Sequence, residues 1–319
     1  MEHTPIILLE EKENRIFIKR DDFIPVSFGG NKARKALKFF EEIDNGGYDH
    51  VVTYGSSSSN HCRIIANMSK ARDLECTIIS PEEESKKTFN SQLMELFGAN
   101  IITVPVNEVS VTIENTLQKL REQGRMPYFI AGGGHGNQGT QAYVDCFEEI
   151  VAFENTTDIK FDYVFHASGT GTTQAGLVCG KLINKKDVTV VGISIARKNP
   201  RGKQVVIDSV SEYLKENGFS FSQEQINEVV EFVDAYVGDG YGKKTDAVDE
   251  TVKEMMCKYA TPMDSTYVGK AYWGMKEYIQ SKKIENKNIL FIHTGGTPLF
   301  FDDLNRFLSK DEKDEHFNS

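Results

Sequence analysis

The sequence contains no long hydrophobic run and little cysteine. No apolar stretch reaches the roughly 18 residues of a membrane-spanning helix. The first residues lack the basic and apolar regions of a secretory signal, so none is expected. The five cysteines are odd in number, scattered, and form no C-x-x-C pair. We therefore expect no disulfide framework, no metal site and a cytoplasmic location.

Positive charge is also in short supply. The chain has 37 basic and 47 acidic residues, which gives a formal net charge of −10. An acidic chain is poorly suited to non-specific binding of nucleic acid or of an anionic membrane surface. We expect neither as a partner, although a local positive pocket for a small molecule is compatible with this balance.

The 319 residues are enough for two domains, and their pattern is that of an α/β protein. Short β-branched runs alternate with helical stretches, which predicts parallel sheets covered by helices on both faces. Strands are expected at 51–54, 76–79, 100–104, 128–131, 163–167, 188–195, 228–233 and 288–293. We predict a small α/β domain over 47–146 and a large domain made of 1–46 and 147–319. The charged tail, 310–319, is expected to fray.

Glycine is not scarce, and its placement is the first positive sign of a site. The total of 26 is ordinary, but many glycines cluster beside expected strand ends, where α/β proteins bind ligands. The first cluster, Gly29-Gly30, is followed by Lys32. Glycines let a backbone approach a ligand closely, and a lysine there can be an anchoring charge or a Schiff-base nucleophile. The spacing alone favours a plain turn before a helix.

Two further glycine segments lie between an expected strand and an expected helix, where backbone N–H groups can bind an anion. Gly55 to His61 contains four serines, which are also good helix caps, so both roles are compatible. The segment 168–173 lacks a P-loop lysine, and Gln174 breaks the dinucleotide pattern G-x-G-x-x-G. A single terminal phosphate, held without a metal ion, suits this segment best.

Two later segments are weaker signals. Tyr241 stands between Gly240 and Gly242, which can leave a phenol exposed and mobile, as an acid or base must be. The segment 293–298 follows an apolar strand. Each of them, taken alone, is more typical of an ordinary loop.

Together these motifs resemble the pyridoxal-phosphate (PLP) enzymes of the 1-aminocyclopropane-1-carboxylate (ACC) deaminase and D-cysteine desulfhydrase family, which has the tryptophan-synthase-β-like fold (fold type II). The matching segments, in the same order, are Lys19–Asp22, Gly29–Lys35, Ser59–His61, 168–176, Gly240–Gly242, Asp264–Lys270 and His293–Gly296. The resemblance implies two three-layer α/β domains with mainly parallel sheets, PLP in the cleft between them, and a homodimer.

The resemblance also implies residues that bind the cofactor. Lys32 would bond PLP covalently, and Lys35 would hold its phosphate. Asn60 would contact the ring hydroxyl. The phosphate loop would contribute its backbone, that is Gly169, Thr170, Gly171, Thr172 and Thr173.

Further roles concern the substrate and the chemistry. Ser59 resembles the family residue that contacts the substrate carboxylate and relays a proton, with Asn60 and His61 beside it. Tyr241 and Tyr267 match the two active-site tyrosines of the family, at the same separation. Lys32, Ser59 and these tyrosines are therefore the candidate catalytic residues.

Three positions distinguish the two branches of the family. ACC deaminases have glutamate directly after the residue that matches Tyr267, and leucine at the position of Thr294. Here Thr294 and His61 match the desulfhydrases, whereas Val268 fits neither branch. Valine cannot keep the ring nitrogen protonated as a carboxylate does. We hypothesise that Thr294 supplies the only hydrogen bond to that nitrogen.

The favoured function is therefore a PLP-dependent lyase that converts D-cysteine to pyruvate, sulfide and ammonia, with Lys32 taking the Cα proton. ACC deaminase, or elimination or replacement on another β-substituted amino acid, stays open because the motifs do not fix the leaving group. The serines at 56–58 also depart from the family pattern. A PLP-binding regulatory protein is the non-enzyme alternative, which the retention of Lys32, Tyr241 and Tyr267 disfavours.

Overall fold

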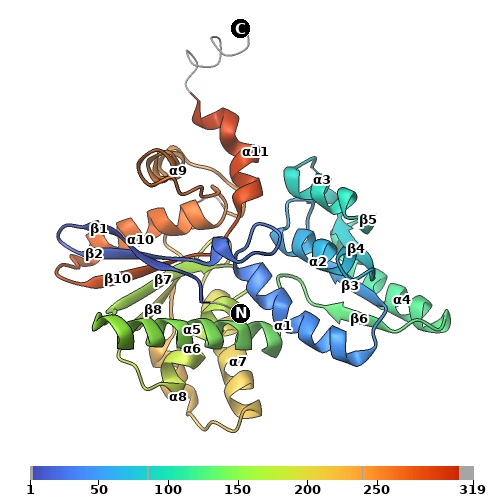
Figure 1. Cartoon of the computed structure of the whole chain (residues 1–319), viewed down its shortest axis with the longest axis horizontal. Helices are drawn as coiled ribbons and strands as arrows, with labels where there is room; N and C mark the ends of the chain where they lie inside the picture. The colour runs from blue at the N-terminus through green and yellow to red at the C-terminus, as the bar shows by residue number, and fades with distance from the viewer. Residues whose placement is uncertain (1–2, 85, 239, 309–319) are drawn as a thin grey trace, which may run out of the picture.

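The computed structural model describes residues 3–84, 86–238 and 240–308, and its strands form two separate sheets (Figure 1). The charged tail at 310–319 lies outside the described residues. Within the described ranges, no helix combines the length and the apolar character that crossing a bilayer requires.

The larger sheet has six strands, and its centre is built from both ends of the sequence. Across the sheet the order is β1 (Ile6–Glu11), β2 (Arg15–Arg20), β10 (Asn288–His293), β7 (Tyr163–Ser168), β8 (Thr189–Ser194) and β9 (Glu231–Val233). All neighbours pair in parallel except β1 and β2, which form an antiparallel hairpin at one edge. The strand β10, late in the sequence, therefore lies between β2 and β7.

Helices cover both faces of the larger sheet (Figure 1). On one face lie α5 (Asn137–Thr157), α6 (Thr172–Ile183), α7 (Arg201–Glu216) and α8 (Gln223–Val229), whose apolar sides share a core with β7 and β8. On the other face lie α9 (Asp246–Tyr259), α10 (Val268–Lys282) and part of α11 (Thr297–Phe307). Parallel strands buried on both faces explain the near-continuous apolar runs in the sequence.

The smaller sheet has four parallel strands, in the order β5 (Asn100–Val104), β4 (Glu75–Pro81), β3 (His50–Tyr54) and β6 (Pro127–Ile130). One face packs against α1 (Asn31–Gly46), α2 (Asn60–Lys70) and α3 (Phe89–Leu96). The other face packs against α4 (Val109–Glu122). This sheet is also the middle layer of three.

The predicted fold class, α/β with two three-layer units and mainly parallel sheets, is confirmed. The domain boundaries at 46/47 and 146/147 stay a prediction. The expected strand at 228–233 begins only at Glu231, because Ser222 and Gln225 form a capping box that starts α8, which extends to Val229. The β1–β2 hairpin was not expected from the sequence.

Candidate active site

A cavity of about 330 Å³ lies where loops from the two sheets meet. Its wall comes from the residues that follow the carboxyl ends of β3, β6, β7, β8 and β10, together with the first turns of α1 and α2 and two tyrosines. In α/β folds ligands bind at this end of the strands. The lining residues are Asn31, Lys32, Tyr54, Gly55, Ser56, Ser59, Asn60, His61, Gly132, Gly133, Ala167, Gly169, Thr170, Ile195, Ala196, Arg197, Tyr241, Tyr267, Thr294 and Gly295.

Most of the residues singled out in the sequence meet in this cavity. Those that line it are Lys32, Ser59, Asn60, His61, Gly169, Thr170, Tyr241, Tyr267 and Thr294. Four others, Lys35, Gly171, Thr172 and Thr173, do not line it and lie in the first turns of α1 and α6 or just before α6.

Lys32 is the second residue of α1, and its amine points toward a glycine loop. Its Nζ donates to the Gly133 carbonyl at 3.0 Å. Burial lowers the pKa of this amine to about 8, because the charged form loses its hydration. About a tenth of Lys32 is therefore uncharged at pH 7, and this neutral amine can act as a base or nucleophile.

The start of α1 is held by two loops of the larger sheet. The Gly30 N–H donates to the Asp21 carbonyl at 2.7 Å, and the Asn31 N–H donates to the Thr294 carbonyl at 3.0 Å. Gly30 and Gly295 both have positive φ, and a Cβ on Gly295 would lie 2.8 Å from the Gly30 Cα. Glycine is required at this crossing, because no side chain fits between the two backbones.

The phosphate-loop candidate is tied to the start of α1. Gly171, with φ +94°, precedes α6. The Asn31 Nδ2 donates to the Thr173 Oγ1 at 3.1 Å, and the Arg197 guanidinium donates to the Thr170 carbonyl at 2.9 Å. The backbone of this loop therefore lies at the N-terminus of α6, near Lys32. The charged guanidinium of Arg197 contacts the same loop.

The start of α2 forms another part of the wall. Ser59 caps this helix by accepting from the Cys62 N–H at 3.1 Å. The side-chain oxygen of Asn60 accepts from the Asn90 amide at 3.0 Å. The NH2 group of Asn60 is therefore what it offers to a ligand in the cavity.

His61 is neutral and has a fixed ring proton. Burial and the charges of Lys32 and Lys35 hold its pKa well below the usual value. The Thr53 hydroxyl donates to the Ile130 carbonyl at 2.7 Å, so its oxygen accepts from the His61 Nε2, 2.9 Å away. The ring proton is thus on Nε2, and Nδ1 is a hydrogen-bond acceptor.

Two tyrosines complete the wall. The hydroxyls of Tyr241 and Tyr267 form a hydrogen bond, and their rings meet edge to face with centroids 5.9 Å apart. Tyr267 is held by Asp264, whose carboxylate accepts from the N–H groups of Thr266 and Tyr267 at 2.9 and 2.7 Å. Tyr241 belongs to the glycine-rich loop before α9 and is partly exposed.

Comparison with known proteins identifies the family of the chain. The family described as pyridoxal-phosphate dependent enzyme matches residues 2–295. The chain belongs to this family. A protein of Pyrococcus horikoshii, provisionally named 1-aminocyclopropane-1-carboxylate deaminase, is 30% identical, with 88% of this chain and 84% of that protein covered. A D-cysteine desulfhydrase of Salmonella choleraesuis is also 30% identical, over 90% of this chain and 88% of the relative.

Solved structures agree with this PLP-dependent family. An ACC deaminase homologue is 29% identical, with a TM-score of 0.84 over 97% of this chain and 94% of that one. A cysteine synthase from Entamoeba histolytica, 19% identical, shares the fold with a TM-score of 0.66 over 97% of this chain and 90% of its own. The chain is thus a PLP-dependent lyase of the ACC deaminase and D-cysteine desulfhydrase type, as the sequence predicted.

The residues present fit PLP. The Lys35 amine is buried and has no hydrogen-bond partner among the described residues, and burial together with Lys32 holds its pKa well below the usual value. An unpaired buried cation is costly unless an anion joins it, and a phosphate supplies one. Gly133 and Gly134 form a cradle beside the two lysines, where a Cβ would lie 2.8 Å from Thr170 and 3.2 Å from Lys35 respectively.

The surroundings of Val268 bear on the chemistry of the cofactor ring. Val268 is fully buried in the core of the larger sheet. Among the described residues that line the cavity, none is aspartate or glutamate. Thr294 therefore lies in a wall without a carboxylate.

Several residues in or beside the cavity wall were not predicted from the sequence. Gly133 and Gly134 were visible as a triple glycine after β6, but nothing in the spacing showed that Gly133 would face Lys32. Arg197 has no motif around it. His135, whose Nδ1 lies 2.8 Å from the Thr172 hydroxyl, is not marked by a motif either. These positions depend on how separate loops converge, which local patterns do not encode.

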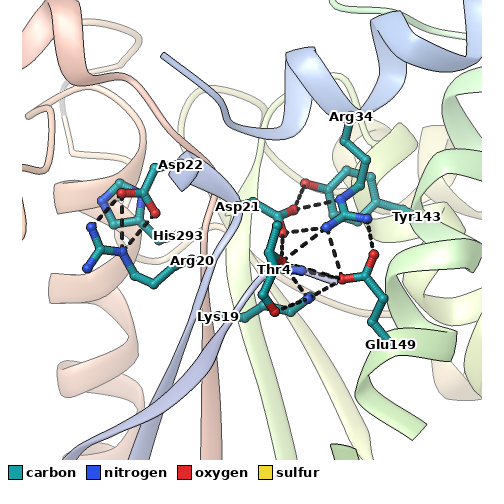
Figure 2. A network of polar contacts seen from close by, with 9 residues as sticks. All are labelled: Thr4, Lys19, Arg20, Asp21, Asp22, Arg34, Tyr143, Glu149 and His293. Atoms are coloured by element: carbon teal, nitrogen blue, oxygen red, sulfur yellow. Dashed lines mark hydrogen bonds and ion pairs between the residues drawn. The ribbon is translucent and has the colours of Figure 1, made fainter. Parts of the chain in front are cut away.

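A buried ionic network holds Arg34, near the start of α1 (Figure 2). The Arg34 guanidinium donates to Asp21 at 2.7 and 3.0 Å and to Glu149 at 2.6 Å. Lys19 pairs with Glu149, and the Tyr143 hydroxyl donates to Asp21 at 2.8 Å. Arg34 stands between Lys32 and Lys35 in α1, so the network anchors the turn of the helix that carries both lysines.

Figure 2 also shows a second cluster, which consists of Arg20, Asp22 and His293. Arg20 donates to both Asp22 oxygens, at 2.8 and 2.6 Å. The His293 Nε2 donates to the Pro262 carbonyl at 2.9 Å, and its Nδ1 accepts from the Gly295 N–H at 3.3 Å. Thr294 is thus fixed on both sides along the chain.

Proposed function

We propose that this protein catalyses the β-elimination of D-cysteine. One D-cysteine and one water give pyruvate, hydrogen sulfide and ammonia, with no change in overall oxidation level. The composition of the cavity wall carries this proposal, because Thr294 and His61 line it without any described carboxylate. A wall of this kind supports loss of a good leaving group, which tolerates a weaker electron sink than the ring opening of ACC.

The residues proposed to hold PLP come from α1 and from the phosphate loop. Lys32 would bond the cofactor, and Lys35 would pair with its phosphate at the start of α6. The NH2 of Asn60 would donate to the ring hydroxyl oxygen, and the hydroxyl of Thr294 to the ring nitrogen. Bound PLP supplies an electron sink for the bonds at Cα. The phosphate loop in this proposal comprises Gly169, Thr170, Gly171, Thr172 and Thr173.

The proposed catalytic roles follow from charge and position. Lys32, with a pKa of about 8, can take the Cα proton as a free amine. The N-terminus of α2 and the Ser59 hydroxyl can hold the substrate carboxylate. The neutral Nδ1 of His61 accepts a hydrogen bond from substrate. The linked hydroxyls of Tyr241 and Tyr267 can deliver a proton to the leaving sulfur.

A substrate panel tests this proposal. We expect pyruvate and sulfide from D-cysteine, and at least tenfold less from L-cysteine. Purified protein should carry the visible absorbance of bound PLP, and Lys32→Ala should lose both absorbance and product. Protein that neither contains nor takes up PLP, or that forms no pyruvate from D-cysteine, contradicts the proposal.

ACC deaminase is the second candidate, because the ACC deaminase homologue covers almost the whole chain. ACC has no Cα proton, so Lys32 could not begin that reaction, and Ser59 or the tyrosine pair would have to open the ring. Formation of 2-oxobutyrate from ACC, faster than pyruvate from D-cysteine, would favour this candidate.

We also propose that the protein is a homodimer of the cytoplasm. Support for the location comes from its cysteines, none of which forms a disulfide. Light scattering after size-exclusion chromatography tests the dimer, with about twice the 35.9 kDa chain mass expected.

A further inference from the structure

A second cavity, of about 790 Å³, adjoins the active-site cavity. The two share four lining residues, Tyr54, Gly55, Ser56 and Tyr241. The second cavity therefore borders the place where an amino-acid substrate would lie. Its remaining wall is formed by Pro81, Val106, Val109, Ser110, Ile113, Glu114, Leu117, Phe129 and Ala131.

This wall is mostly apolar and partly exposed. The turn at Val106–Glu108 and the following helix α4, on the outer face of the smaller sheet (Figure 1), contribute most of its aliphatic side chains. Val106 is 63% exposed and Phe129 is 37% exposed. Glu114 is the one charged residue among the described lining residues. Contiguous exposed apolar side chains beside a cavity are typical of a binding surface.

Tyr54 stands at the junction of the two cavities and is well fixed. Its ring stacks on Phe129, with centroids 6.3 Å apart and planes 9° apart. The ring also lies against Gly132, where a Cβ would approach it to 2.8 Å. Tyr54 thus presents an aromatic surface that runs from the active site into the second cavity.

We propose that the second cavity binds an apolar group on the β-sulfur of the substrate, so that the enzyme acts on S-alkyl and S-benzyl cysteines. This inference rests on the proposed function. The 330 Å³ cavity has to contain PLP as well as the amino acid, so a substituent of several carbons must extend beyond it. The shared residues lead such a group to Tyr54, Val109 and Leu117.

The reaction balances without a further reactant. The Cβ–S bond breaks, the sulfur leaves as the thiol after it gains a proton, and the Cα proton is the one lost to the enzyme. Water then releases pyruvate and ammonia. S-Alkyl-D-cysteine and one water therefore give pyruvate, ammonia and the alkanethiol.

A homologous series tests the inference, because unbranched alkanethiols are similar leaving groups. We expect kcat/KM for pyruvate formation to rise about three- to fourfold per added methylene from S-methyl- to S-propyl-D-cysteine. The S-benzyl compound should exceed S-methyl by at least tenfold. A flat or falling series overturns the inference, even though D-cysteine itself is consumed.

Variants on α4 test the location. Val109→Asp should remove the dependence on chain length and leave turnover of D-cysteine within about twofold. Val111→Asp is the matched control, because Val111 is on the same helix, 50% exposed, and outside the wall. Should Val109→Asp fail to fold, Val106→Asp on the exposed rim takes its place. An unchanged length dependence in the variant that folds overturns the inference.

The substrate series and the oligomeric state together distinguish failure of this inference from failure of the proposed function. Pyruvate from D-cysteine with no gain from longer thioethers overturns the inference alone, whereas no product from any amino acid overturns the proposed function as well. A change of Val109→Asp from dimer to monomer on size exclusion, with the length dependence retained, assigns the groove to a second copy of this chain and overturns the inference.

Discussion

At the scale of single residues, Gly30 allows the start of α1 to approach the loop that follows β10. Gly30 has φ +95°, and a Cβ there would lie 2.4 Å from the Thr294 carbonyl oxygen. That carbonyl accepts the Asn31 N–H beside Lys32. A side chain at Gly30 would therefore displace Thr294 and Lys32 together.

We predict that Gly30→Ala lowers kcat at least 100-fold, because a shift of about 1 Å at a catalytic group has this effect. Gly98→Ala is the control, since Gly98 has φ +73° but nothing within 4 Å of its Cβ position. Alanine at this position is also strained by a positive φ but meets no clash. Steady-state kinetics on both variants, with PLP content measured, gives the comparison; equal losses in the two would contradict this role.

The lowered pKa of Lys32, about 8, predicts how the protein without PLP reacts with it. Only the neutral amine adds to an aldehyde, so the rate of PLP capture should rise about tenfold per pH unit below 8 and level off above it. Stopped-flow absorbance measures this rate. The free amine of N-acetyl-lysine, whose pKa is not lowered by burial, should keep rising to about pH 10. A protein profile that follows the free amine would disprove the prediction.

At the scale of elements, α1 is held by the buried network of Arg34, Asp21, Glu149 and Lys19 (Figure 2). Burial alone would raise the pKa of Asp21, but the charges of Arg34 and Lys19 outweigh it and lower that pKa to about 2. The network thus stabilises the fold only while Asp21 is ionised.

Removing one charge from this network leaves another buried without its partner. We predict that Asp21→Asn lowers the free energy of unfolding by about 3–5 kcal/mol at pH 7. Glu254→Gln is the control, because it breaks an exposed pair with Lys276 and should cost at most about 1 kcal/mol. Urea denaturation of both variants measures the difference.

Asp21 also makes the free energy of unfolding depend on pH. The folded-state pKa of Asp21, about 2, is below its usual 3.8, so its contribution is complete above about pH 4 and is lost as pH falls toward 2. The stability difference between the native protein and Asp21→Asn should therefore shrink over this window. A difference that is constant from pH 5 to pH 2 would refute the assignment.

Elements were predictable from the sequence to the extent that their signals are local. Apart from β2, the parallel strands of both sheets followed from short apolar, often β-branched runs, and the start of α2 from its serines. The β1–β2 hairpin was missed because its edge strand, Ile6–Glu11, has four apolar residues followed by two glutamates and so lacks the alternation of a half-buried strand. The late start of β9 arose from a helix cap at Ser222 that competes for the same residues. The wall positions of Gly133 and Arg197 depend on long-range contacts, which no local pattern contains.

At the scale of the whole molecule, the thiols report on the integrity of both cores. Cys62, Cys76 and Cys146 are buried, and burial raises the pKa of each to about 12. Cys179 is buried as well, and its pKa is also raised. Only Cys257 is exposed, on α9.

We predict that a thiol reagent labels one cysteine of the native protein and five after denaturation. A buried, protonated thiol reacts slowly, because the thiolate is the nucleophile. Mass spectrometry counts the labels, and Cys257→Ser should reduce the native count to zero with activity unchanged. Rapid labelling of a second site in the native protein would show that one of the cores opens.

The position of β10 has a consequence for the order in which the protein forms during synthesis. The smaller sheet uses only residues 50–130, so it can assemble as soon as that stretch has left the ribosome. The hairpin β1–β2, made first, has to wait for a strand encoded at 288–293 to join it to the rest of its sheet. Thr294 arrives with that strand, so an unfinished chain cannot yet bring it beside Lys32. Catalytic competence therefore cannot appear before the chain has been synthesised as far as Thr294.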